Sequence, residues 1–232
     1  MPEEPHPHRS FLADFILGSQ DGMVNILGIL LGLTAAGSGL RLILIASFAA
    51  LGAESISMGA VAYTSMSARR SLYESEVARE MHEMRTMPVE ERAEVSGILQ
   101  SWGLSGSEHD ELLERICRSP KVMLEFMMAF ELHLSPIAPD EPRKSGMLVG
   151  AATVVGSFIP LVPFLVYPND LHVSIGASVV LSAAALFGVG VYEAKTTIGS
   201  IWKSGTRMAI IGLIAGFAGF LVGHFLGAAP GL

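Results

Sequence analysis

Glutamates and methionines at helical spacing stand out in the charged segment 71–142, which lies between long apolar stretches. Three groups have members three or four residues apart: Glu80 and Glu83, Glu91 and Glu94, and Met127 and Met128 with Glu131. On an α-helix this spacing places the members of each group on one face. Carboxylates neutralise a divalent cation and supply oxygen ligands, whereas thioether sulfur adds a softness that Mg2+ and Ca2+ do not favour. The pattern predicts a site for Fe2+ or a similar transition-metal ion.

An alternative interpretation exists for the glutamates. Glutamates three residues apart on an exposed helix are usually solvated charge, so the four paired glutamates alone would be a weak signal. The methionine pair followed by a glutamate favours the metal site, because solvated charge does not account for it.

Two of the acidic residues inside the apolar stretches bear on transport. Asp21 lies about a third of the way into the first stretch, and Glu54 lies in the second, four residues before Met58. A carboxylate in the hydrocarbon core is costly unless it has a function. We therefore expect Asp21, Glu54 and Met58 to form a polar path for a cation. The alternatives are that Asp21 caps a helix at the membrane interface and that Met58 simply fills a gap in the packing.

Membrane helices must position these residues. The 232 residues are 50% hydrophobic and only 16% charged, with a mean hydropathy of +0.49, which is more apolar than a usual soluble domain. Five stretches are long enough to cross a hydrocarbon core, which needs about 20 helical residues: 12–37, 41–67, 146–168, 172–194 and 206–227. The sequence predicts an all-α integral membrane protein with five transmembrane helices.

The segment between the second and third spans is expected to be a helical metal-binding domain. Its predicted helices cover 72–85, a stretch that begins at 87–91, then 108–118 and 120–134, with a turn at 103–107. The predicted domains are thus 1–70, with the first two spans, 71–142, and 143–232, with the last three. Small residues four apart, such as Gly28 with Gly32 and Gly219 with Gly223, also fit close helix packing in a dimer.

Charge patterns suggest the orientation and exclude several functions. Basic residues at 69–70, 143–144 and 195–207 predict that the N-terminus and segment 71–142 are cytoplasmic. The net charge of −7 comes mainly from that segment, which argues against nucleic-acid binding and fits a cation-attracting surface. No phosphate loop or dinucleotide fingerprint occurs, so ATP-driven pumping by this chain is not expected. The lone Cys117 cannot form an intrachain disulfide.

Four short segments together resemble the vacuolar iron transporter family: Gly18-Ser19-Gln20-Asp21-Gly22, Ile56-Ser57-Met58-Gly59, Phe126-Met127-Met128-Ala129-Phe130-Glu131-Leu132 and Ile159-Pro160-Leu161-Val162-Pro163. The resemblance implies five transmembrane helices, a cytoplasmic metal-binding domain and a homodimer with the ion path near the subunit interface. It also implies that Asp21 and Met58 belong to the membrane path and that the seven glutamates and methionines named first are cytoplasmic ligands.

One position departs from the family pattern. Plant and parasite members have a glutamate eight residues before the membrane methionine, where this chain has Ala50. Glu54 lies one helical turn later and is the candidate replacement, on the same face but about 6 Å farther along the axis.

The resemblance implies export of Fe2+ from the cytosol in exchange for protons, with Mn2+, Co2+ and Zn2+ as further candidate ions, and no enzymatic activity. A membrane-bound iron oxidase is the first alternative, although the Glu-x-x-His spacing typical of di-iron sites is missing here. A membrane-tethered metal sensor or buffer is the second. We expect the lipid bilayer of a prokaryotic cytoplasmic (inner) membrane as the location, and a vacuolar membrane as the second choice.

Overall fold

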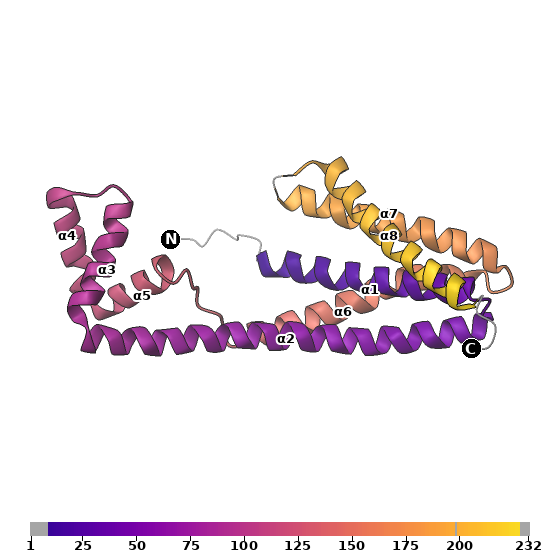
Figure 1. Ribbon diagram of the computed structural model, residues 1–232, viewed down its shortest axis with the longest axis horizontal. Coiled ribbons are helices and arrows are strands. Elements are labelled where there is room, and N and C mark those ends of the chain that lie inside the picture. The colour runs from indigo at the N-terminus through magenta and orange to yellow at the C-terminus, as the bar shows by residue number, and fades with distance from the viewer. Residues whose placement is uncertain (1–8, 198, 228–232) are drawn as a thin grey trace. The chain divides into compact units, whose positions relative to one another are not determined.

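The computed structural model describes residues 9–197 and 199–227, and within these ranges the chain forms eight α-helices and no strand (Figure 1). The helices are α1 (Arg9–Ala35), α2 (Leu40–Thr86), α3 (Pro88–Ser101), α4 (Gly106–Cys117), α5 (Pro120–Phe130), α6 (Glu141–Val166), α7 (Leu171–Thr196) and α8 (Ile201–Gly227). Five of them, α1, α2, α6, α7 and α8, are long and apolar enough to cross a membrane. The expected all-α chain with five long apolar helices is confirmed.

Contacts divide the chain into two compact units. Residues up to Thr64 and from Pro142 onward form the first, here called the bundle, and Ser65–Glu141 form the second, here called the insert unit. Helix α2 begins in the bundle and ends in the insert unit as one uninterrupted helix of 47 residues. It continues because no glycine or proline occurs between Gly59 and Pro88, so nothing in the sequence breaks the helix there.

Glycines let the helices of the bundle approach one another closely. A Cβ atom added to Gly223 would lie 1.8 Å from the carbonyl oxygen of Gly32, and one added to Gly219 would lie 2.4 Å from that of Gly28. Helices α1 and α8 therefore meet backbone to backbone. Between α6 and α1, a Cβ atom on Gly156 would lie 2.1 Å from the carbonyl oxygen of Ser19. From the sequence, the glycine pairs on α1 and α8 were consistent with close helix packing in a dimer. In the structure they pack α1 against α8 within one chain.

The insert unit has an apolar core of its own. Residues of α3, α4 and α5 form it: Val95, Leu99, Leu113, Ile116, Met123 and Met127. Helix α3 begins at Pro88, whose missing amide hydrogen is not needed in a first turn. Helix α4 begins at Gly106, so the turn after α3 is shorter than the predicted 103–107.

Helix α5 ends at Phe130, so the predicted helix over 120–134 is wrong at its C-terminal end. The amide groups of Leu132 and Leu134 donate hydrogen bonds back to the carbonyl oxygens of Met127 and Met128, at 3.1 and 2.8 Å. His133 between them has a positive φ of 54°. Helices often end where amide groups beyond the last turn donate hydrogen bonds to carbonyl groups of that turn, around a residue in the left-handed conformation. Helix propensities do not predict such an end.

Candidate metal centre

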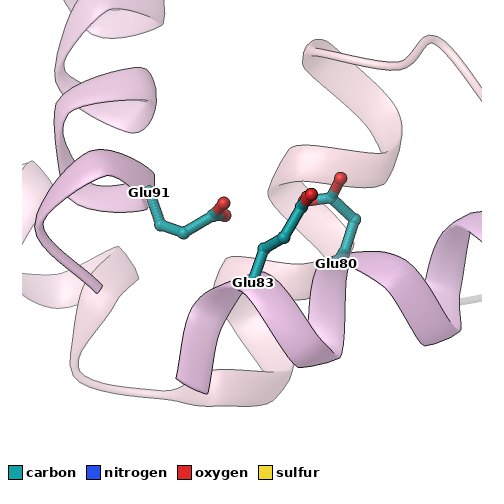
Figure 2. A group of neighbouring side chains, drawn as sticks. All are labelled: Glu80, Glu83 and Glu91. Atoms are coloured by element: carbon teal, nitrogen blue, oxygen red, sulfur yellow. The ribbon is translucent and has the colours of Figure 1, made fainter. Parts of the chain in front are cut away.

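Three glutamates of the insert unit converge. Glu80 and Glu83 extend from the last turns of α2, and Glu91 extends from the first turn of α3 toward them (Figure 2). One carboxylate oxygen from each lies within 4.8 Å of the others, which is close enough for all three to bind one ion. The short link at Met87 between α2 and α3 turns the chain back and so brings the two helix ends together. We call these three residues the glutamate cluster.

Burial makes the glutamate cluster costly for the protein alone. Glu80 is 1% exposed and Glu91 is 2% exposed. The Oε2 atom of each accepts no hydrogen bond from any described residue. Buried carboxylate oxygens are normally paired or bound to a metal, because an unpaired one loses its hydration without compensation. A cation between the three side chains would supply that compensation.

The pKa values of Glu80 and Glu91 are raised because both carboxyl groups are buried. Burial, followed by repulsion from Glu80 and Glu94, raises the pKa of Glu91 to about 7. Burial also raises the pKa of Glu80, and the neighbouring charge of Arg79 opposes that rise. Proton binding by the metal-free cluster therefore extends to neutral pH, where protons and a metal ion compete for the same oxygens.

The other predicted ligands lie around the glutamate cluster. Glu94 is exposed on α3, and its charge contributes to the raised pKa values of Glu80 and Glu91. Glu131 caps the C-terminal end of α5 and is exposed as a residue. Its pKa is nevertheless raised, by partial burial of the carboxylate and by repulsion from Glu94 and Glu80. Both glutamates therefore belong to the electrostatic surroundings of the cluster.

The two methionines are buried, at 0% exposure for Met127 and 2% for Met128. Met127 packs in the apolar core with Val95 and Leu99, so packing accounts for its position. The assignment of both methionines as metal ligands stays a prediction.

Arg79 is a residue of the site that the sequence analysis did not single out. Its guanidinium forms ion pairs with Glu76 at 2.6 Å, Glu80 at 3.4 Å and Glu83 at 3.5 Å. Two of these partners belong to the glutamate cluster. The spacing could have shown it, because Arg79 follows Glu76 by three residues and precedes Glu83 by four.

In the bundle, an asparagine joins the two membrane carboxylates. The amide nitrogen of Asn25 on α1 donates hydrogen bonds to Asp21, one turn earlier at 3.3 Å, and to Glu54 on α2. These three residues are called the carboxylate bridge below. Asp21 and Glu54 were predicted from the sequence as members of one path, whereas Asn25 was not, although it lies one turn from Asp21 in a largely apolar stretch.

An open groove of about 460 Å3 borders the carboxylate bridge. Its lining includes Asn25 and Glu54 together with Ala50, the position where the family pattern has a glutamate. Glu54 thus lines the same groove as Ala50, and its role as a replacement stays a prediction. Met58 lies one turn beyond Glu54 on α2 and is half-buried, and its part in a path stays a prediction.

These features define a multi-pass membrane protein with an acidic cluster in a compact helical unit between its second and third apolar helices. Residues 12–224 match the VIT family, and the chain belongs to that family. It is 32% identical to Vacuolar iron transporter 1 of Arabidopsis thaliana over 93% of this chain and 88% of the relative. It is also 32% identical to Vacuolar iron transporter 2 of Oryza sativa subsp. japonica, over 94% and 90% of the two chains, and 29% identical to Vacuolar iron transporter of Plasmodium falciparum, over 93% and 82%.

The match spans both units of the chain, so it covers the membrane helices and the glutamate cluster together. The family consists of transporters, and the chain is accordingly a metal transporter and not an enzyme. The oxidase alternative from the sequence is therefore set aside.

Proposed function

We propose that this protein moves Fe2+ out of the cytosol across its membrane in exchange for protons, and that the insert unit captures the ion first. The observation that carries the proposal is the pair of buried, unpartnered carboxylate oxygens of Glu80 and Glu91 within the glutamate cluster. Buried carboxylate oxygens without a partner are suited to binding a cation, and the names of the relatives indicate which one they transport.

The ligand chemistry supports a transition-metal ion. Glu80, Glu83 and Glu91 supply carboxylate oxygens, which both Fe2+ and Mn2+ accept as ligands. Met127 and Met128 would add sulfur, which favours the softer members of the series over Mg2+ and Ca2+. We propose Fe2+ as the main cargo and Mn2+ as a second, with Co2+ and Zn2+ able to occupy the same site.

The raised pKa of Glu91 supports proton coupling. Below about pH 7 the carboxyl group holds a proton and is a poor ligand, and above it the carboxylate is free to bind metal. Metal capture therefore releases protons near neutral pH. We propose that the carboxylate bridge continues the path in the membrane, where Asp21 and Glu54 bind the cation and protons alternately.

We further propose that the N-terminus and the insert unit face the cytosol, as the distribution of basic residues predicts. The functional form is proposed to be a homodimer in a prokaryotic cytoplasmic membrane, with a vacuolar membrane as the alternative that the relatives' names suggest.

The test is metal flux into sealed proteoliposomes under an imposed pH gradient, with internal pH recorded alongside internal Fe2+. Variants Asp21→Asn and Glu54→Gln remove the membrane carboxylates, and Asp14→Asn on the same helix α1 is the matched control. We expect Fe2+ uptake with opposite proton movement in the unchanged protein and in the control, and its loss in the other two. Flux that ignores the gradient would contradict exchange and indicate a channel.

A metal sensor or buffer is the second candidate, because the glutamate cluster lies in a compact unit of its own. In that case the Asp21→Asn, Glu54→Gln double variant would bind metal normally, and no flux would be found even in the unchanged protein.

A further inference from the structure

We propose that Arg79 is a resident counter-ion of the glutamate cluster, which the cargo cation must displace in order to bind. This inference rests on the proposed metal capture and adds a residue that sets its affinity. It begins with the position of the guanidinium, which lies 3.4 Å from a carboxylate oxygen of Glu80 and 3.5 Å from one of Glu83.

The geometry shows that Arg79 and a metal ion would compete. A cation bound by the glutamate cluster needs one oxygen each from Glu80, Glu83 and Glu91. Arg79 pairs with Oε1 of Glu80 and Oε2 of Glu83, so a divalent ion held by the same carboxylates would lie close to the guanidinium, and the two positive charges would repel each other.

Arg79 can leave the glutamate cluster without becoming unpaired. Its shortest ion pair, 2.6 Å, is with Glu76, which is not a member of the cluster. The side chain is 49% exposed, so its charge can also be solvated after displacement. Glu80, in contrast, has a side chain that is only 2% exposed and cannot turn to solvent. The arginine is therefore the mobile partner, and the buried glutamate is the fixed one.

The charge of Arg79 acts on more than its direct contacts. It lowers the pKa values of Glu80 and Glu131 against the larger effect of burial. In the metal-free protein this positive charge partly compensates the crowded carboxylates. When metal arrives, the same charge weakens its binding, which assists its later release.

The test measures Co2+ binding to the whole protein in detergent by calorimetry, at low ionic strength and about pH 8, which lies above the pKa of about 7 of Glu91. Co2+ is an oxidation-stable probe that binds such sites at least as well as Fe2+. The variant is Arg79→Gln, and the control is Arg115→Gln. Arg115 pairs with Glu111 at 2.6 Å on α4, so its loss changes the net charge equally outside the cluster.

We expect Arg79→Gln to bind Co2+ about tenfold more tightly, the effect of removing one positive charge roughly 6 Å from a divalent ion in a water-like dielectric. Arg79→Lys, which keeps the charge, should bind like the unchanged protein. Unchanged or weaker binding by Arg79→Gln relative to Arg115→Gln would overturn the counter-ion role. Absence of Co2+ binding in the unchanged protein would overturn the proposed metal capture as well, so the two failures are distinguishable.

A second measurement needs no variant and therefore applies even if Arg79→Gln folds poorly. An arginine-selective dicarbonyl reagent is reacted with the unchanged protein with and without Co2+, and the modified peptides are quantified by mass spectrometry. Displacement predicts that Arg79 reacts severalfold faster in the presence of Co2+ while Arg115 is unaffected. Equal or slower reaction of Arg79 would contradict displacement.

Discussion

Replacing Glu91 by glutamine should stabilise the metal-free protein and at the same time weaken metal binding. Glu91 is 2% exposed, and one of its carboxylate oxygens has no hydrogen-bond partner among the described residues. Its pKa is raised from 4.5 to about 7. At about 1.4 kcal/mol for each pKa unit, ionisation of this side chain above pH 7 opposes folding by at most about 3.5 kcal/mol.

The sign of the pH dependence follows from the raised pKa. Between about pH 4.5 and 7 the folded protein holds a proton on Glu91 that the unfolded chain has released. Its contribution to stability is therefore complete at low pH and is lost as the pH rises through about 7. Glutamine is neutral at every pH, so Glu91→Gln should gain about 1 to 3 kcal/mol at pH 8 and almost nothing below pH 5.

The assay is thermal unfolding of the whole protein in detergent at both pH values, with Glu111→Gln on the exposed face of α4 as the control. Metal titration of the same samples at pH 8 should show at least about tenfold weaker binding by Glu91→Gln, since a ligand oxygen and its charge are lost. If Glu91→Gln destabilised the metal-free protein at pH 8, or left the pH dependence of stability unchanged, the argument from burial would be refuted.

Three further outcomes are expected. Asn25→Leu, which keeps the size of the side chain but removes both hydrogen bonds of the carboxylate bridge, should raise the KM for Fe2+ flux in proteoliposomes, whereas Ser57→Ala in the same groove should not. His109→Ala should lower the free energy of unfolding by about 2 kcal/mol in thermal melts, because a buried ring that hydrogen-bonds Ser96 at 2.9 Å is lost; full stability would contradict this. Gly223→Ala should lower the melting temperature, because its Cβ atom would meet α1; an unchanged melt would disprove the close packing.

Periodicity and residue type were sufficient for the helical architecture. The five apolar helices were predictable because about 20 consecutive apolar residues have few other stable environments than a bilayer. Helix ends were less predictable. The end of α5 at Phe130 depends on hydrogen bonds that run back into its last turn and on the left-handed conformation of His133. The continuity of α2 through residue 86 follows from the absence of glycine and proline between Gly59 and Pro88.

The sequence by itself determined which residues could bind a cation, because spacing puts Glu80 beside Glu83 on one helix face whatever the fold. Only the tertiary structure decided that Glu91 from the next helix meets them and that Glu80 and Glu91 are buried with unpartnered oxygens. The physical reason is that helical spacing is a local property of the backbone. Burial and charge compensation instead depend on which helices pack together, and that is a property of the whole folded chain.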